Sequence, residues 1–327
     1  MTEKLGEFEI IETYFSPLTK DEKGAFNLAD DAAVLEVPKG KSLVVTTDTL
    51  VEGIHFLKGD LPKNVGAKLL RVSLSDLAAM GSVPAYYNLS IAFKASITPS
   101  WFKEFADALL KDQNQFGITL IGGDTVSTTG PLTLTITAFG VVQKGKVIRR
   151  NGARVGDDIW VSGSIGDAAL GLKVASGELE NISRINKNHL LSRYFKPIPQ
   201  TFLGPKLVNH INSAIDISDG LIADLNHICK ASNLGAQIQL SSIPLSKATK
   251  TALATRPDYI DLILGGGDDF ELLFTADKSF RILQKSLTKE LKVSLTRIGN
   301  IVGGSSTLII DKKGKEYPLP KAGYTHF

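Results

Sequence analysis

The sequence has almost none of the residues that build disulfides or thiolate metal centres. Cys229 is the only cysteine among 327 residues, which excludes an internal disulfide and a cysteine cluster for zinc or iron–sulfur. No apolar stretch approaches the roughly 18 residues of a membrane-spanning helix. The opening residues MTEKLGEFEI lack the basic start and apolar run of a signal peptide. We therefore expect a cytoplasmic protein without a membrane partner.

Charge and phosphate-loop motifs also give little indication of a ligand. Lys and Arg outnumber Asp and Glu by only 37 to 34, too small an excess to indicate a nucleic-acid partner. The sequence GKS at residues 40–42 resembles the end of a P-loop, but Leu35 stands where the first glycine is required. Residues 162–172 have the pattern of strand, glycine turn and helix, which fits either an anion site at the helix N-terminus or an ordinary crossover.

Length and apolar content predict two domains. Hydrophobic residues make up 43% of the chain, and a domain usually holds roughly 100–200 residues. Strand-like and helix-like segments alternate in both halves, which is typical of α/β proteins. We expect an N-terminal domain at residues 1–150 and a C-terminal domain at residues 151–327, each a mixed sheet with helices. Strands are expected at 42–47, 86–93 and 132–142 and near 158, 214, 273 and 298, and helices at 62–80, from 98 onward, at 168–175 and at 221–231.

The most informative pattern is an aspartate in a turn directly after an apolar or β-branched run. Because ligands collect at strand ends in α/β folds, repetition of this pattern predicts a site rich in carboxylates. Asp and Gly are also ordinary turn formers, so each instance alone has a plain structural explanation. The instances are Asp30 and Asp31, Asp48, Asp124, Asp216 and Asp219, and Asp268 and Asp269.

Asp76 adds a carboxylate from a helix. It shares one helical stripe with Val65, Leu69 and Val72, so it is expected to point inward, where an unpaired charge is unfavourable. Two carboxylates about 4 Å apart repel by about 4 kcal/mol at an effective dielectric near 20. Oxygen ligands of this kind suit Mg²⁺. Such a site fits phosphoryl transfer, and the same residues leave metal-assisted hydrolysis open.

A few basic residues are candidates for phosphate binding. His55 follows soon after Asp48 and is expected beside the same strand end. Arg149 and Arg150 precede the expected domain boundary, where they either clamp a phosphate or form a solvated basic turn. The remaining histidines are expected to be ordinary surface or core residues.

Seven motifs in order resemble the thiamine-monophosphate kinase family, which belongs to the superfamily of aminoimidazole ribonucleotide synthetase. The resemblance extends from Gly6 to the closing GYTHF. It implies a two-domain α/β fold that binds ATP without a P-loop, and a homodimer formed through the N-terminal domains. Ala29 and Asp268 depart from the family pattern, which usually has glycine and glutamate there. The motifs are GEFEIIETYF, DDAAVL, TTDTLVEGIHF, SLSDLAAMG, IGGDT, DISDGLIADL and GGGDDFEL.

The resemblance also implies a role for individual residues. Several magnesium ions would be bound by Asp31, Thr46, Thr47, Asp48, Asp76, Asp124 and Asp216, with Asp219 holding a further ion. The co-substrate ATP would contact Gly123, Asp124, Arg150 and Ser218, and thiamine monophosphate would contact His55, Asp268 and Tyr324.

The expected reaction is direct in-line attack of a phosphate oxygen of thiamine monophosphate on the γ-phosphorus of ATP, giving thiamine diphosphate and ADP. The acceptor is already an anion, so no strong general base and no phosphoenzyme are needed. Three other functions would use the same residues. They are an ATP-dependent synthetase, a binding protein without turnover, and a metal-dependent phosphatase.

Overall fold

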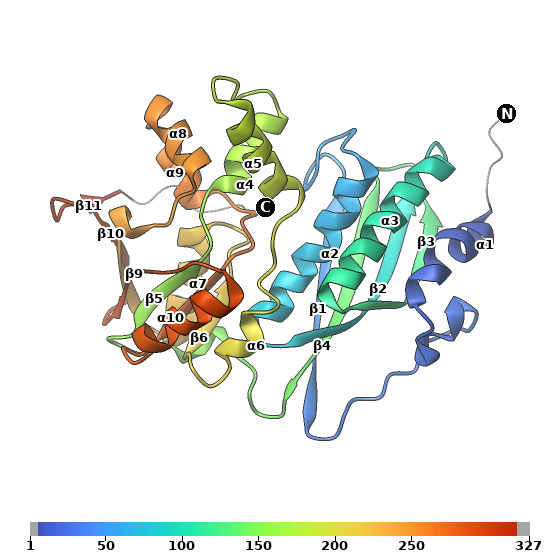
Figure 1. The fold of residues 1–327 in the computed structure, drawn as a ribbon, viewed down its shortest axis with the longest axis horizontal. Coiled ribbons are helices and arrows are strands. Elements are labelled where there is room, and N and C mark those ends of the chain that lie inside the picture. Colours follow the sequence, from blue (N-terminus) through green and yellow to red (C-terminus); the bar gives the residue numbers. More distant parts are fainter. Residues whose placement is uncertain (1–5, 319–327) are drawn as a thin grey trace. The chain divides into compact units, whose positions relative to one another are not determined.

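The computed structural model describes residues 6–318 and divides into two compact units. The N-terminal unit comprises Met1–Leu77 and Ser82–Gly145, and the C-terminal unit comprises Ala78–Gly81 and Lys146–Phe327. Each unit is a sheet with helices (Figure 1), which confirms the α/β expectation. Among the residues described, no helix is long and apolar enough to cross a membrane.

The N-terminal sheet has the strand order β1-β4-β2-β3. Strand β4 pairs antiparallel with both β1 and β2, whereas β2 and β3 are parallel. Strands β1 and β3 therefore form opposite edges of this sheet. Strand β3 was not among the strand ranges expected and continues past Asp124, and β1 is longer than expected because it continues past Asp48. The strands are β1 (Lys41–Val51), β2 (Val83–Phe93), β3 (Thr119–Ser127) and β4 (Thr133–Gln143).

Helices α2 (Pro62–Ala79) and α3 (Pro99–Phe116) lie side by side against this sheet (Figure 1). Helix α3 begins as expected, since the Thr98 hydroxyl accepts a hydrogen bond from the Trp101 amide at 3.3 Å. Alternate residues of β4 are buried, including Leu134 and Ile136, and pack into the core of this unit. The residues between them are partly exposed, so the sheet also has an outer face.

Short helical turns precede the first strand. Their apolar side chains Ile10, Phe15 and Leu18 are buried in the core of the N-terminal unit. The turns are α1 (Glu7–Ile10), η1 (Ile11–Phe15), η2 (Ser16–Thr19) and η3 (Lys23–Leu28).

The C-terminal sheet has the strand order β11-β10-β7-β9-β5-β8-β6. Neighbouring residues of β5 contact different cores, because Ile159 and Val161 join one cluster and Trp160 joins the other. The sheet is therefore covered on both faces. Its strands are β5 (Asp158–Ser162), β6 (Ser213–Asp216), β7 (Gly235–Gln239), β8 (Leu272–Ala276), β9 (Leu295–Val302), β10 (Thr307–Ile310) and β11 (Glu316–Tyr317).

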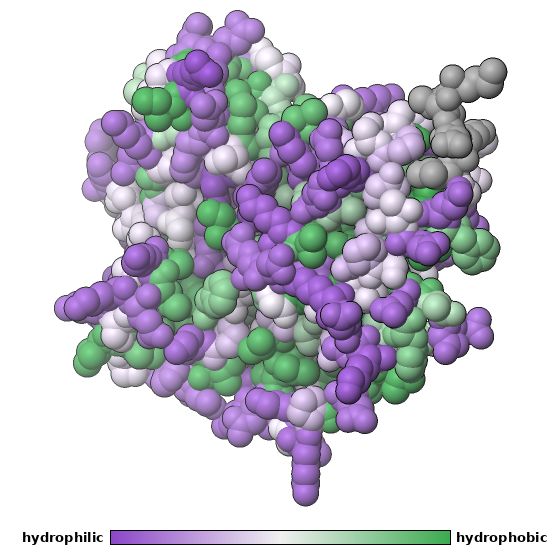
Figure 2. Space-filling view, turned by 45° about the vertical axis from the view of Figure 1, so that its right-hand side comes forward, coloured by the Kyte–Doolittle hydropathy of each residue, from purple (hydrophilic) through white to green (hydrophobic). Residues whose placement is uncertain are grey.

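The helices of the C-terminal unit include several that sequence patterns did not predict, above all within residues 177–205. All the helices described in this unit, predicted or not, are η4 (Arg150–Gly152), α4 (Asp167–Ala175), α5 (Arg184–Phe195), α6 (Gly204–Leu207), α7 (Leu221–Ser232), η5 (Leu240–Ser242), α8 (Lys247–Thr255), α9 (Tyr259–Gly265) and α10 (Phe280–Leu291). On the face seen in Figure 2, hydrophilic residues predominate and hydrophobic residues are exposed in small groups.

Candidate active site

Strand β1 and helix α2 bring four of the polar side chains together. Thr46 and Asp48 are two residues apart, so both point from β1 toward the same side of the sheet. The Thr46 hydroxyl donates to the Asp76 carboxylate, and the Ser73 hydroxyl donates to Asp48 Oδ2 at 2.8 Å. Asp76 lies on the stripe that the sequence predicted, with Val65, Leu69 and Val72 all buried.

The charge of Asp76 is close enough to affect the ionisation of Asp48. Burial and, next, the negative charge of Asp76 together raise the pKa of Asp48 to about 6, although the hydrogen bond from the Ser73 hydroxyl opposes the shift. A divalent cation would relieve this conflict, because it neutralises both carboxylates at once. Carboxylate and hydroxyl oxygens are also the donors that Mg²⁺ prefers, so the side chains present fit that ion.

Thr47 belongs to the other face of the sheet. Its hydroxyl lies 3.0 Å from the hydroxyl of Thr137 across the β1–β4 pair, and Thr49 makes the same kind of contact with Thr135 at 2.8 Å. The structure therefore does not bring the Thr47 side chain to the Asp48 cluster.

A second group of predicted residues lines a pocket at the β3 edge. The pocket has a volume of about 120 Å³ and is lined by Asp31, Gly123 and Asp124, together with the turns that precede β1. Asp124 is exposed, and its Oδ1 accepts from the Thr125 amide at 2.9 Å. At Gly123 an added Cβ would lie 1.9 Å from the carbonyl oxygen of Leu89, so the close pairing of β2 and β3 requires glycine at this position.

The sheet topology separates these two groups. Asp48 and Asp124 lie on opposite edge strands, and three strand spacings of about 4.8 Å correspond to roughly 14 Å. Asp124 also pairs with the exposed Ser90 on the outer face, whereas Asp48 faces α2. Magnesium–oxygen distances are about 2 Å, so one chain in this arrangement cannot offer both carboxylates to one ion.

His55 lies in the loop that follows β1. Its Nδ1 accepts from the Val51 amide at 3.0 Å, and its carbonyl oxygen accepts from Lys68 Nζ at 3.0 Å. Because Nδ1 is the acceptor, the neutral ring carries its proton on Nε2. An imidazole N–H of this kind can donate a hydrogen bond to an anionic oxygen.

In the C-terminal unit, Asp216 ends β6 and a tight turn with Ser218 and Asp219 leads into α7. Asp224, one turn into α7, accepts from the amides of Ser218, Asp219 and Gly220 at 3.1–3.2 Å. Burial raises the pKa of Asp224 to about 7, with the charge of Asp219 as the next cause.

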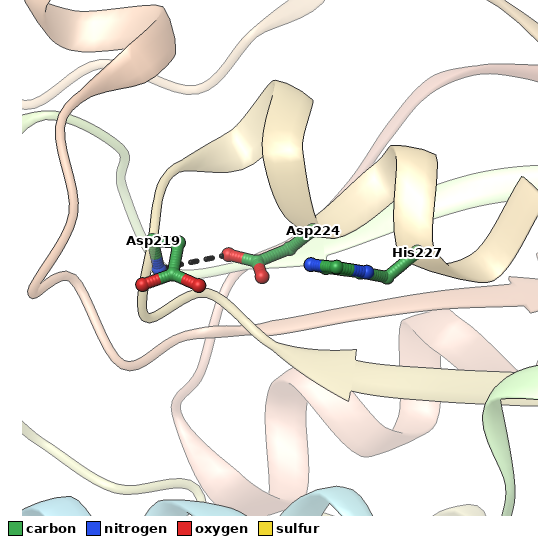
Figure 3. A group of neighbouring side chains, drawn as sticks. All are labelled: Asp219, Asp224 and His227. Atoms are coloured by element: carbon green, nitrogen blue, oxygen red, sulfur yellow. Dashed lines mark hydrogen bonds between the residues drawn. The ribbon is translucent and has the colours of Figure 1, made fainter. Parts of the chain in front are cut away.

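Asp224 and His227 were missed by sequence reasoning. One ligand atom from each of Asp219, Asp224 and His227 lies within 4.8 Å of the others, and Figure 3 shows these side chains in a row along the start of α7. Two carboxylates and an imidazole are a suitable donor set for a divalent cation. The spacing of three residues between Asp224 and His227, one helical turn, was the available signal.

Asp268 lies in a loop that touches the same turn. Its amide donates to the Ser218 carbonyl at 2.9 Å. Ser218, which is expected to contact ATP, and Asp268, which is expected to contact thiamine monophosphate, are therefore neighbours. Asp269 is buried and accepts from the amides of Gly166 and Ala168, at 2.6 and 3.2 Å. The anion that the glycine turn at residues 162–172 could have held is therefore this internal carboxylate.

Two other predicted residues lie apart from these groups. The carbonyl of Arg150 accepts from the Ser232 hydroxyl at 3.3 Å, at the end of α7 opposite to Ser218, and a helix of this length spans about 18 Å. Tyr324 lies outside the described residues 6–318.

The expectation that each aspartate follows the end of a strand is wrong in most cases. Asp48 and Asp124 lie inside β1 and β3, and Asp268 follows helix α9. Asp48 can lie inside a strand because hydroxyls from α2 and β1 lie on the same side of the sheet as its carboxylate. Asp124 can do so because β3 is an exposed edge strand. Only Asp216 and Asp219 match the expected strand-end pattern.

Comparison with known proteins gives matches over nearly the whole chain. Residues 29–142 match the AIR synthase related protein N-terminal domain, and residues 154–311 match the AIR synthase related protein C-terminal domain. The thiamine-monophosphate kinase of Buchnera aphidicola subsp. Schizaphis graminum is 38% identical over 325 residues, which is 98% of each chain.

Solved structures agree with these matches. The crystal structure of thiamine-monophosphate kinase from Stenotrophomonas maltophilia K279a is 40% identical with a TM-score of 0.81, covering 89% of this chain and 91% of that one. A structure described as AaThiL complexed with AMPPCP and TMP is 27% identical with a TM-score of 0.77 over the full length of both chains. The expected AIR synthase-like fold is thereby confirmed.

Proposed function

This chain belongs to the thiamine-monophosphate kinase family of AIR synthase related proteins, and we propose that it transfers the γ-phosphoryl group of ATP directly to thiamine monophosphate at a magnesium-dependent site. It is an ATP-dependent phosphotransferase that forms thiamine diphosphate and ADP. The relative solved with AMPPCP and TMP supports this pair of ligands. The expected cytoplasmic location stays a prediction.

The observation that carries the proposed mechanism is the Asp48–Asp76 cluster. The charge of Asp76 raises the pKa of Asp48, and the two carboxylates accept hydrogen bonds from the hydroxyls of Thr46 and Ser73, so the pair of charges is unfavourable without a cation. Bound Mg²⁺ would supply charge neutralisation for two anionic substrates. The chain's own groups hold the reactants, and the acceptor phosphate attacks in line without a protein nucleophile.

Residues of both units take the remaining roles in binding nucleotide, metal and substrate. In the N-terminal unit, Asp31, Gly123 and Asp124 bind nucleotide and metal, and His55 donates from Nε2 to the substrate phosphate. In the C-terminal unit, Ser218 contacts ATP, Asp216 and Asp219 bind metal, and Asp268 contacts thiamine monophosphate. The expected contacts of Arg150 with ATP and of Tyr324 with thiamine monophosphate stay predictions, since Arg150 lies apart from this group and Tyr324 lies outside the described residues.

A homodimer is part of the proposal because one N-terminal unit separates its ligands. Asp48 and Asp124 lie on opposite edges and faces of the sheet. The outer face exposes apolar side chains such as Val45 and Val126, at 52% and 47%, and uncovered apolar surface favours association. In a dimer that covers this face and joins the β3 edge of one copy to the β1 edge of its partner, Asp124 would lie next to the partner's β1–α2 cluster.

Turnover is tested with purified protein, ATP, Mg²⁺ and thiamine monophosphate, with free thiamine and no acceptor as controls. We expect ADP and thiamine diphosphate in equal amounts, with the diphosphate identified by chromatography. Inorganic phosphate in place of the diphosphate would favour a synthetase or a phosphatase. Tight binding without ADP would favour a binding protein.

The shared site is tested by mixing inactive variants. In a heterodimer of Asp48→Ala and Asp124→Ala, one site carries both changes and the other carries neither, so random reassortment restores roughly a quarter of the wild-type rate. A mixture of Asp48→Ala with Asp76→Ala is the matched control, because both changes lie in the same cluster and no intact site can form. Equal inactivity of both mixtures would contradict the shared site.

A further inference from the structure

The loop that carries Asp268 has an unusual backbone conformation. Asp268 has φ +70° and Phe270 has φ +49°, so two residues with side chains occupy the left-handed region within three positions. Residues other than glycine remain in this region only where their surroundings hold them there. The residue between them, Asp269, is only 1% exposed, so its carboxylate needs hydrogen-bond partners inside the protein.

Asp269 anchors the loop to the start of helix α4. Its two carboxylate oxygens accept from the Gly166 amide at 2.6 Å and from the Ala168 amide at 3.2 Å. Helix N-termini present amides without a partner inside the helix and carry partial positive charge, so a carboxylate is well matched to this place. The two bonds fix both the position and the rotation of the side chain next to Asp268.

A buried ion pair fixes the other side of the loop. Arg193 Nη2 donates to the Asp269 carbonyl at 3.3 Å and to Glu271 Oε1 at 2.7 Å. Glu271 Oε2 also accepts from the Ser162 hydroxyl at 2.5 Å and from Gln200 at 2.8 Å. Residues 269 and 271 are therefore held by side chains from three other segments of the C-terminal unit, namely α5, β5 and the loop with Gln200.

The same loop is bonded to the turn that holds Ser218. The amides of Asp268 and Phe270 donate to the carbonyls of Ser218 and Ile217, at 2.9 and 2.8 Å. At Gly267, an added Cβ would lie only 2.1 Å from the Ser218 carbonyl. A shift of Asp268 would therefore break contacts that also define the neighbouring turn.

From these contacts we infer that Asp269 is a positioning residue for substrate binding. Its carboxylate at the α4 N-terminus, with Arg193 on its carbonyl, holds Asp268 in the left-handed conformation from which Asp268 reaches thiamine monophosphate. Asp269 itself does not contact the substrate. This inference rests on the proposed kinase function, because it explains how Asp268 is oriented toward the substrate of that reaction.

The test is Asp269→Asn, assayed at pH 8. An amide accepts with only one of its two terminal atoms, so one of the Gly166 and Ala168 amides loses its partner and the loop relaxes. We expect the KM for thiamine monophosphate to rise about tenfold, with kcat changed by less than about threefold, as for a loss of ground-state binding. Asp158→Asn is the matched control, since Asp158 is an equally buried carboxylate that binds Arg281 and Arg297 elsewhere in the unit.

A double-mutant cycle separates positioning from general destabilisation. Asp268→Asn removes the contact group itself and keeps a residue that tolerates the left-handed region. If Asp269 acts through Asp268, adding Asp269→Asn to that variant should raise the KM by less than about twofold, because the two changes are not additive. A full tenfold rise in both backgrounds, or in the Asp158→Asn control, would overturn the inference.

Hydrogen exchange provides a readout that does not depend on turnover. In Asp269→Asn, the amides of Asp268 and Phe270 should lose protection while those of β9 keep it. Unchanged protection of the loop would overturn the inference even if the enzyme is active, and a wild-type protein that forms no thiamine diphosphate would instead refute the proposed function. If Asp269→Asn does not fold, Arg193→Lys carries the same test, since lysine keeps the charge beside Glu271 but lacks the guanidinium fork.

Discussion

Replacing Asp48 with asparagine is expected to stabilise the metal-free protein while it abolishes turnover. The Ser73 hydroxyl donates to Asp48 Oδ2, and an asparagine oxygen can accept the same hydrogen bond. The substitution therefore keeps the shape and the hydrogen bond of the side chain and removes only its charge. Asp76 then no longer faces a second carboxylate.

The size of the effect follows from the pKa of Asp48. Burial and the Asp76 charge raise this pKa from 3.8 to about 6 in the folded protein, and one pKa unit corresponds to about 1.36 kcal/mol. Ionised Asp48 thus lowers the free energy of unfolding by up to about 3 kcal/mol above pH 7. The folded state binds the proton more tightly, so the wild type gains stability as the pH falls from 7 toward 4. By pH 5 it recovers about half of the difference.

The assay is urea unfolding in EDTA at pH 8 and pH 5. The chain has two tryptophans, and Trp101 and Trp160 lie in different units. A Trp160→Phe background therefore lets Trp101 fluorescence report on the N-terminal unit alone. We expect Asp48→Asn to be more stable by about 1–3 kcal/mol at pH 8 and by about half as much at pH 5. Mg²⁺ at about 1,000 times its Kd should reverse the order, because it then adds about 4.1 kcal/mol only to the protein that binds it.

An asparagine variant that is no more stable than the wild type in EDTA at pH 8 would refute this reasoning. So would a gain that stays the same at pH 5, because the gain would then not come from the charge of Asp48. Either result would also weaken the case for a cation between Asp48 and Asp76.

Three further predictions concern other parts of the chain. Asp76→Ala should lower thiamine diphosphate formation by at least about a thousandfold without lowering the urea midpoint of the metal-free protein; a folded variant with the wild-type rate would remove Asp76 from the mechanism. Gly123→Ala should destabilise the N-terminal unit by about 2–4 kcal/mol, because its Cβ would meet the Leu89 carbonyl at 1.9 Å; circular dichroism during urea unfolding measures this. Asp224 has its pKa raised to about 7 by burial, so metal-free wild type should gain up to about 1.4 kcal/mol per pH unit below pH 7, and Asp224→Asn should lose this dependence in unfolding followed by Trp160 fluorescence.

Local periodicity predicted the elements whose signals lie within a few turns of chain. The stripe through Val65, Leu69 and Val72 identified the inward side of α2, and Thr98 with Pro99 marked the start of α3. These signals depend on helix geometry and on amides at one helix end, which neighbouring residues determine. The ordered motifs likewise identified the family, which the comparisons confirm.

The same local patterns misjudged how aspartates relate to strands. An apolar run followed by aspartate predicted a strand end at Asp48 and Asp124, yet both strands continue past these residues. A carboxylate can remain inside a strand when a hydroxyl or solvent meets its side of the sheet, and the sequence nearby does not say which residue will do so. Asp224 and His227 were missed for a related reason, since only the turn at Gly220 brings Asp219 beside them.

The sequence by itself determined the family and the α/β class, and it supplied the candidate side chains for metal and phosphate. Only the tertiary structure decided which of them meet: Thr46, Asp48 and Asp76 lie together, Asp124 lies on the far edge strand, and Asp269 occupies the helix end that an outside anion could have used. Strand order and sheet face come from pairings between distant segments, and these pairings are selected by burial over a whole unit rather than by the residues next to each aspartate.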